Sequence, residues 1–227
     1  MIRYAATLTT FIFIMIYAAL IYPLYILTGK RVGKNTVKNT FKMVLWINRV
    51  KVDVSGRENI DPSKKYLVVS NHQSVFDIPI VSVAVGLDIR IFAKKELSRF
   101  PLFGQLLYLY DFVFVNRNNK REAVKNLKKA AEVMKSYSFL VFPEGTRSKD
   151  GKVGEFKTGA ISLALGNDVN ILPVAILDSH KIMTKGSLKI NPGTVKVKIF
   201  EPTVSLENEK RKDIASRLQK TISSYVD

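Results

Sequence analysis

The sequence contains no cysteine and only two histidines, His72 and His180. Without cysteine there are no disulfides, thiolate nucleophiles or cysteine-ligated metal sites, and two histidines are too few for a histidine-rich metal centre. The phosphate-cradling patterns GxxxxGK[ST] and GxGxxG are also missing, as is the GxSxG elbow of serine hydrolases. We therefore expect a site that uses neither a metal ion nor a nucleophile supplied by the protein.

Acidic residues are scarce in the chain. Over 227 residues there are 19 Asp and Glu against 36 Lys and Arg, which gives a formal net charge of +17. This imbalance implies an anionic partner, such as nucleic acid, an acidic membrane surface or a phosphorylated small molecule. The aromatic residues lie within apolar runs and not between basic residues, which argues against nucleic acid.

Charge is absent from residues 4–29, a stretch of 26 residues. As a helix it would be about 39 Å long, enough to cross a hydrocarbon core of roughly 30 Å. We interpret it as a retained anchor and not a cleaved signal peptide, because it is long and lacks a clear cleavage site. Spanning the bilayer and re-entering it on the same side both remain open.

Residues 30–51 carry seven basic residues and no acidic one. On a helical wheel the basic and apolar positions fall on opposite sides. We favour a helix that lies on an anionic membrane; the alternative is a helix packed on the protein with its basic side in solvent. Residues 1–49 are thus predicted to form an N-terminal membrane-binding motif of two helices, and residues 50–227 a separate domain.

Short apolar runs alternate with helical patterns after residue 51. The expected strands are 50–54, 66–69, 89–93, 112–115, 139–142, 171–176 and 195–200, and the expected helices are 78–85, 102–109, 121–135, 157–165 and 207–225. The intervals suit βα units, so we predict an α/β fold with a mainly parallel central sheet of about seven strands flanked by helices.

His72 and Asp77 follow the predicted strand 66–69. If a loop carries His72 and Asp77 opens the next helix, Asp77 can accept one ring N–H and leave the other nitrogen as a base. A structural histidine beside a helix-capping aspartate is the alternative, because this spacing alone is a short pattern.

Polar side chains follow four of the predicted strands, where parallel strands would bring them to one edge of the sheet. They are Asn71 and His72, then Lys94 and Lys95, then Asn116 and Arg117, and finally Glu144, Gly145, Thr146 and Arg147. Arg147 suits a bidentate phosphate contact, and the other cations add positive charge. Without a protein nucleophile, His72 most simply activates a substrate hydroxyl.

Two blocks of sequence resemble those of the glycerolipid acyltransferase family. Residues 71–77 are similar to its NHxxxxD block and residues 142–147 to its FPEGTR block. Residues 93–97 and 101–104 resemble the bacterial PlsC branch, the 1-acyl-glycerol-3-phosphate acyltransferases, and the likeness covers residues 50–202. The second block of the family commonly ends in Asp-Arg, whereas residues 116 and 117 are Asn and Arg.

The resemblance implies transfer of an acyl group from acyl-CoA or acyl carrier protein to the sn-2 hydroxyl of lysophosphatidic acid, without a cofactor. In that scheme His72 is the general base and Asp77 orients it. The remaining roles are those of a substrate site. The acceptor phosphate is held by Lys94, Arg117 and Arg147, and Glu144 positions either Arg147 or the loop. Lys95, Gly145 and Thr146 are the other residues expected to bind substrate.

Backbone N–H groups near Asn71, or its side chain, would hold the oxyanion that forms on the thioester carbonyl. The family also implies an anionic phospholipid membrane as partner, at the cytoplasmic face of the bacterial inner membrane. Glycerol-3-phosphate or another lysolipid remains an alternative acceptor. The alternative that is not an enzyme is a basic protein that binds anionic lipid without catalysis.

Overall fold

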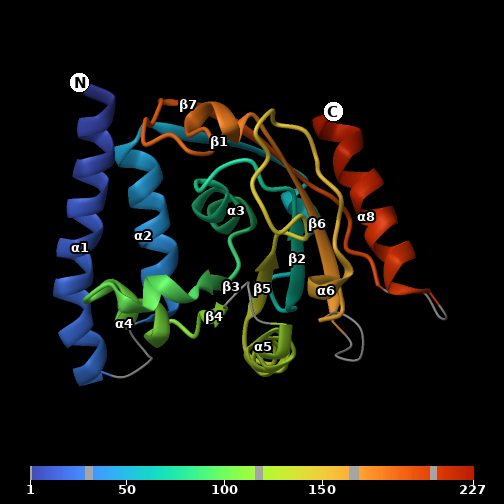
Figure 1. Cartoon of the computed structure of the whole chain (residues 1–227), viewed down its shortest axis with the longest axis horizontal. Coiled ribbons are helices and arrows are strands. Elements are labelled where there is room, and N and C mark those ends of the chain that lie inside the picture. The colour runs from blue at the N-terminus through green and yellow to red at the C-terminus, as the bar shows by residue number, and fades with distance from the viewer. Residues whose placement is uncertain (1, 29–32, 116–119, 164–168, 205–208) are drawn as a thin grey trace.

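A single seven-stranded sheet forms the centre of the molecule (Figure 1). The computed structural model describes residues 2–28, 33–115, 120–163, 169–204 and 209–227. The strand order is β1-β7-β6-β2-β5-β3-β4, and every neighbouring pair is parallel except β6 and β7. The strands are β1 (Val50–Ser55), β2 (Tyr66–Ser70), β3 (Ile89–Lys94), β4 (Val113–Val115), β5 (Ser138–Val141), β6 (Asn170–Leu177) and β7 (Gly193–Ile199). This confirms the predicted mainly parallel α/β sheet.

The helices in the described part of the chain follow the predicted pattern with small shifts. They are α1 (Ile2–Thr28), α2 (Gly33–Ile47), α3 (Asp77–Val85), α4 (Phe103–Leu109), α5 (Lys120–Met134), α6 (Thr158–Ile161), α7 (Ser179–Ile182) and α8 (Arg211–Val226), with 3-10 turns η2 (Arg57–Asn59) and η3 (Lys95–Arg99). The predicted end of helix 157–165 and the predicted start of helix 207–225 lie outside the described residues. The turn α7 and both 3-10 turns were not expected.

Two layers of helices cover the two faces of the sheet. In Figure 1 helices α2 and α3 lie on one face, and α6 and α8 lie on the other. Strand β2 shows why: Tyr66 and Val68 belong to the core on one face, Leu67 and Val69 to the core on the other, and none exceeds 1% exposure. A strand buried on both sides needs a continuous apolar run, which is the pattern that predicted it.

The two N-terminal helices lie side by side against the rest of the chain (Figure 1). On α2 the apolar residues Val37, Val44 and Leu45 are buried in the core that also contains residues of α3. These side chains are therefore packed on the protein, as the alternative prediction has it, and membrane binding by the two-helix motif stays a prediction. An amphipathic helix covers whichever apolar surface is available, and here α3 supplies one.

Helix α1 is joined to the end of α2 by a buried polar contact. Thr10 and Asn48 exchange hydrogen bonds at 3.1 and 2.9 Å, and Asn48 also donates to the carbonyl of Val44 at 2.8 Å. Away from this contact the helix presents exposed apolar side chains, including Leu20 at 69% and Leu27 at 83% exposure. Over the described ranges, no helix combines the length and the hydropathy that crossing a membrane requires.

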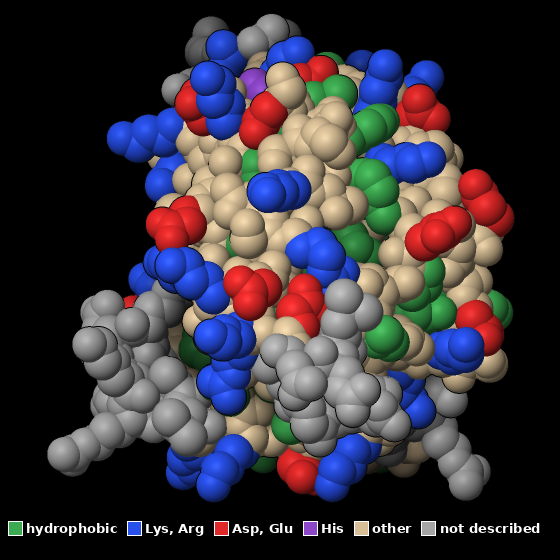
Figure 2. Space-filling view, turned by 90° about the vertical axis from the view of Figure 1, so that its right-hand side faces the viewer, with side chains coloured by type: hydrophobic (Ala, Val, Ile, Leu, Met, Phe, Trp, Pro, Cys, Tyr) green, Lys and Arg blue, Asp and Glu red, His purple; other side chains and the backbone are tan. Residues whose placement is uncertain are grey.

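The positive charge is dispersed on the side of the molecule that carries α8. Figure 2 shows lysine and arginine side chains interspersed with acidic and apolar ones across this view. Between the areas that the figure leaves grey, basic residues do not gather into one continuous patch. The face in this view therefore offers no concentrated basic surface for an anionic ligand.

Candidate active site

The predicted site residues meet because four neighbouring strands run in parallel. Strands β2, β5, β3 and β4 are adjacent in that order, so their carboxyl ends share one edge of the sheet. At this edge lies a pocket of about 640 Å³ whose polar lining includes His72, Lys94, Thr146 and Arg147. Its apolar lining comes mainly from α1, α2, α3, α4 and β3 and includes Ile14, Phe41, Val44, Ile78, Ile91, Phe103 and Leu107.

His72 and Asp77 adopt the predicted arrangement. His72 lies in the loop after β2, and Asp77 is the first residue of α3. The Nδ1 atom of His72 lies 2.8 Å from Oδ2 of Asp77. The imidazole ring also stacks on Phe142, with ring centroids 4.0 Å apart and planes 12° from parallel. Both the orientation of the ring and the nitrogen that faces the carboxylate are thereby fixed.

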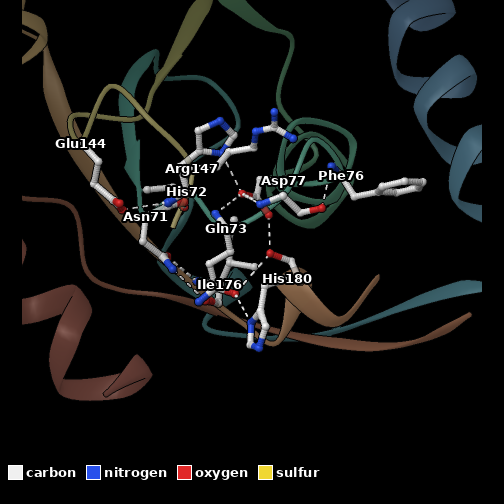
Figure 3. A network of polar contacts seen from close by, with 12 residues as sticks. Asn71, His72, Gln73, Phe76, Asp77, Glu144, Arg147, Ile176 and His180 are labelled. Atoms are coloured by element: carbon white, nitrogen blue, oxygen red, sulfur yellow. Dashed lines mark hydrogen bonds and ion pairs between the residues drawn. The ribbon is translucent and has the colours of Figure 1, made fainter. Parts of the chain in front are cut away.

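The hydrogen bonds around Asp77 determine the tautomer of the histidine (Figure 3). Asp77 has no exposed surface, and its Oδ2 accepts the backbone N–H groups of Gln73 and Ser74 at 2.6 and 2.8 Å. Its Oδ1 accepts the hydroxyl of Ser179 at 2.5 Å. An oxygen that already accepts two N–H donors has no proton to offer, so Nδ1 of His72 carries the hydrogen. The other ring nitrogen, Nε2, is then available as a base.

Glu144 lies beneath the loop that carries His72 and is 5% exposed. Its Oε1 accepts the backbone N–H of His72 at 2.9 Å, so it supports this loop and has no hydrogen bond or ion pair to Arg147 among the described residues. Burial raises its pKa from 4.5 to about 7, aided by the nearby carboxylates of Asp77 and Asp227 and opposed by the N–H groups of His72 and Gly154. The prediction that Glu144 positions a loop is supported, and positioning of Arg147 is not.

Asn71 is fully buried and is not among the residues that line the pocket. Its amide nitrogen donates to the carbonyl of Ile176 at 2.9 Å, and its amide oxygen accepts the N–H of the same residue at 2.8 Å. The side chain therefore fastens the loop after β2 to strand β6 (Figure 3). This placement does not support the predicted role of the Asn71 side chain in holding an oxyanion.

The cations predicted for phosphate binding have different surroundings. Arg147 lines the pocket, and the next residue, Ser148, donates its N–H to the carbonyl of His72 at 2.7 Å. Lys94 also lines the pocket, although its ammonium lies 3.3 Å from the carboxylate of Glu96 at the surface. Arg147 is thus tied closely to the loop of His72, whereas Lys94 lies at the rim.

The other predicted binding residues contribute less directly. Lys95 is exposed at the start of η3 and is absent from the pocket lining. Gly145 has a φ of 70°, which lets the chain turn between Glu144 and Thr146. The prediction for Arg117 falls outside the described residues, as does Asn116. Across the described ranges, no three His, Asp or Glu side chains form a group that could hold a metal ion.

Four residues at the site were not predicted from the sequence. Gln73 donates to the carbonyl of Gly151 at 2.5 Å, and its side-chain oxygen lies 3.3 Å from the hydroxyl of Ser179. His180 lies 3.4 Å from the same oxygen, and Lys185 lines the pocket. Ser179 and His180 come just after β6, past Asp178, so extending the search for polar groups after strands to the predicted strand 171–176 would have found them.

The half-buried His72 and the buried Asp77 thus form a hydrogen-bonded pair beside the pocket at the carboxyl edge of an α/β sheet. The Acyltransferase family model matches residues 51–177, and the chain belongs to this family. The crystal structure of PlsC, the 1-acyl-sn-glycerophosphate acyltransferase from Thermotoga maritima, is similar with a TM-score of 0.80 and 29% identity. That match covers 98% of this chain and 95% of the other.

Curated relatives with matching sequences carry the name 1-acyl-sn-glycerol-3-phosphate acyltransferase. The protein from Cocos nucifera is 34% identical over 175 residues, which is 76% of this chain and 56% of the relative. The protein from Borreliella burgdorferi is 34% identical over 145 residues, which is 63% of this chain and 58% of the relative. The match thus spans little more than half the length of these relatives. The family resemblance inferred from the two sequence blocks is confirmed.

Proposed function

We propose that the protein transfers an acyl group from a thioester donor to the sn-2 hydroxyl of lysophosphatidic acid, giving phosphatidic acid. The observation that carries this proposal is the His72–Asp77 pair at a pocket that is largely apolar and has cations at its polar end. The names of the relatives in the same family agree with this substrate. The donor is acyl-CoA or acyl carrier protein, since the chemistry requires only a thioester.

His72 acts as the general base in this mechanism. Nε2 removes the proton of the acceptor hydroxyl, while the Asp77 carboxylate holds Nδ1–H and stabilises the imidazolium that forms. The alkoxide-like oxygen attacks the thioester carbonyl, the C–S bond breaks, and the thiolate takes the proton back from the imidazolium. The products are the new ester and the free thiol. General base catalysis of this kind contributes about 10²–10⁴ in rate.

The pocket suits an acceptor with an anionic head and an apolar chain. Arg147 and Lys94 supply positive charge near His72, where the acceptor phosphate would place the hydroxyl within reach of the base. The side chains of α1, α2 and α4 that line the rest of the pocket supply an apolar environment for a hydrocarbon chain. Arg117, outside the described residues, remains a predicted third phosphate contact.

Membrane binding belongs to the same proposal and uses the outer side of the N-terminal helices. Exposed apolar residues recur along α1 at Ile12, Ile16, Leu20 and Leu27, which share one side of a helical wheel. On α2, Trp46 is 78% exposed. With a net charge of +17, these side chains favour adsorption to an anionic phospholipid surface. The cytoplasmic face of the bacterial inner membrane remains the predicted location.

An acceptor panel tests the proposed function. The purified protein is assayed with an acyl-CoA and, in turn, lysophosphatidic acid, glycerol-3-phosphate, lysophosphatidylcholine and monoacylglycerol. We expect the highest kcat/KM with lysophosphatidic acid. Arg147→Ala should lose most of this preference for a phosphate, whereas Arg99→Ala, which removes an exposed cation outside the pocket, should keep it. A higher rate with another acceptor would reassign the substrate, and vesicle binding without thioester consumption would favour the non-enzymatic alternative.

A further inference from the structure

The chain segment after β6, residues 178–185, borders the active site although it lies beyond the family match at residues 51–177. It begins with Asp178, a non-glycine residue with a φ of 74°, and continues as α7. Aspartate adopts this left-handed conformation more readily than most residues, and here it leads the chain from β6 into α7. The segment is also fastened to the loop of His72, because the hydroxyl of Ser74 donates to the carbonyl of Met183 at 2.8 Å.

Ser179 is the residue of this segment that reaches the catalytic pair. It has no exposed surface, and its hydroxyl donates to Oδ1 of Asp77 at 2.5 Å. The other oxygen of Asp77 holds His72 and two backbone N–H groups, so Ser179 is the donor that fixes the remaining oxygen. Without this bond the carboxylate would lose one of the contacts that set its rotation and, through it, the orientation of the His72 ring, while the two backbone N–H groups would still hold Oδ2.

Lys185 is the residue of this segment that reaches the phosphate-binding side. Its ammonium donates to the hydroxyl of Thr146 and to the carbonyl of Arg147, both at 2.9 Å, and its side chain lines the pocket. Among the described residues no carboxylate lies within ion-pair distance of Lys185, in contrast to Lys94, which pairs with Glu96. Its charge is therefore available to an anion in the pocket, next to that of Arg147.

We propose that the segment after β6 supplies two functional side chains to this enzyme. Ser179 is a positioning residue that holds Asp77 in the orientation that presents His72 as a base. Lys185 is a substrate-binding residue that, together with Arg147, binds the phosphate of the acceptor. The proposal rests on the proposed function and adds to it residues that lie outside the recognised sequence blocks.

The role of Ser179 is tested without substrate by ¹⁵N NMR of the imidazoles. The chain has only two histidines, so His180→Gln assigns both sets of resonances. In the unaltered protein we expect His72 with hydrogen on Nδ1 and none on Nε2. Ser179→Ala should keep this tautomer but shift the proton resonance of the His72 Nδ1–H and speed its exchange with water, because the carboxylate that accepts this N–H is held less firmly. Ser224→Ala, which removes a hydroxyl from the surface of α8, should leave both unchanged. The same Nδ1–H resonance and exchange rate in both variants would overturn the role of Ser179.

The kinetic effect of Ser179→Ala separates positioning from a loss of folded protein. We expect kcat to fall on the order of tenfold to a hundredfold with KM for the acceptor unchanged, because the base is misoriented while the binding residues stay in place. Circular dichroism on the same sample confirms the fold. An unchanged kcat would overturn the positioning role, whereas a wild-type protein that acylates no lysophosphatidic acid would overturn the proposed function and leave the NMR test of Ser179 intact.

The role of Lys185 is tested by equilibrium binding. We compare lysophosphatidic acid with monoacylglycerol of the same chain length in the unaltered protein, Lys185→Met, Lys185→Arg and the control Lys189→Met, which alters an exposed lysine outside the pocket. Lys185→Met should weaken binding of the phosphate-bearing lipid about tenfold and leave monoacylglycerol binding unchanged. Lys185→Arg should retain most of the preference for lysophosphatidic acid over monoacylglycerol that the unaltered protein shows. Lys189→Met should retain all of this preference.

Two contrary results have different meanings in this experiment. If the unaltered protein prefers lysophosphatidic acid and Lys185→Met keeps that preference, Lys185 does not bind the phosphate and the proposed function stands. If Lys185→Met weakens both lipids equally, Lys185 only holds the loop of Thr146 and Arg147. If the unaltered protein shows no preference, the proposed acceptor is wrong.

Discussion

Glu144 carries a carboxyl group at a position where a charge is costly, and this gives a prediction on pH and stability. Its pKa is about 7 in the folded protein against an ordinary 4.5. Between these values the folded chain binds more protons than the unfolded chain, so the free energy of unfolding falls as pH rises from about 4.5 to about 7. The full effect is roughly 3 kcal/mol.

Glu144→Gln removes the titration and isolates this effect. We expect the free energy of unfolding of the variant, minus that of the unaltered protein, to rise by roughly 3 kcal/mol between pH 4.5 and pH 8. The reason is that only the unaltered protein must bury a charge at high pH. Urea denaturation at several pH values measures the difference. Stability curves that stay parallel across this range would show that Glu144 is not titrating as described.

Asn71 is expected to act on stability through strand β6. Asn71→Ala leaves the buried N–H and C=O groups of Ile176 without their side-chain partner, so the free energy of unfolding should fall by roughly 2–5 kcal/mol. Asn59→Ala is the matched control, because Asn59 makes one partly buried hydrogen bond to the carbonyl of Ile199 and its loss should cost about 1 kcal/mol. Equal costs for the two variants would contradict the importance assigned to Asn71.

The positions of single residues at the site were predictable where a local rule applied. His72, Lys94 and Arg147 were found because each follows a recognisable strand, and parallel strands bring such residues together. The contact of Asn71 with strand β6 was not predictable. Its partner Ile176 is 105 residues away, and backbone hydrogen-bonding groups leave no trace in the sequence. Lys185 was not predicted either, because a single lysine in a basic chain resembles a surface residue until its position is known.

At the scale of elements, the strands were predicted well and the contact surface of α2 was not. Strands buried on both faces require continuous apolar runs, and these runs mark their positions within one or two residues. The pattern of α2 shows only that one side is apolar. It does not distinguish a membrane from α3, which buries Val37, Val44 and Leu45 in the structure.

Helix α1 gives a prediction for membrane binding. Leu20 and Leu27 are largely exposed, so changing both to Ser should leave the free energy of unfolding within about 0.5 kcal/mol. If these residues enter the lipid, the double variant should bind anionic vesicles at least about tenfold more weakly, since burying each leucine contributes about 1.5–3 kcal/mol. Vesicle co-sedimentation measures the affinity.

The control for this experiment is Val204→Ser, which alters an apolar residue that is 52% exposed and lies beside α8, where Arg217 donates to its carbonyl at 3.2 Å. It should leave the affinity for vesicles unchanged. If the double variant on α1 also binds vesicles as tightly as the unaltered protein does, then this side of α1 does not contact the membrane.

At the scale of the whole molecule, the N-terminal helices and the α/β domain line one pocket. Thr10, Ile14 and Tyr17 of α1 and Val44 of α2 line the same space as His72. The sequence predicted an appendage at residues 1–49 and a catalytic domain at residues 50–227, but it did not predict that both build the pocket. Such a cavity depends on how distant segments pack, and no short stretch of sequence encodes it.

The overall topology was predictable only in part for a related reason. Alternating strand and helix patterns indicate parallel βα units, and these account for all but one of the strand pairs in the described sheet. The antiparallel pairing of β6 and β7 was not predicted, because the apolar runs of both strands have the same appearance in either direction.

The central claim is that His72 is the base for acyl transfer to lysophosphatidic acid, and the most direct measurement compares the unaltered protein with His72→Ala. The rate of phosphatidic acid formation from lysophosphatidic acid and acyl-CoA is measured at saturating concentrations of both, with circular dichroism to confirm the fold. The unaltered protein should form phosphatidic acid, and the folded variant should be slower by about 10²–10⁴. Near-normal turnover in a folded His72→Ala protein would contradict the mechanism.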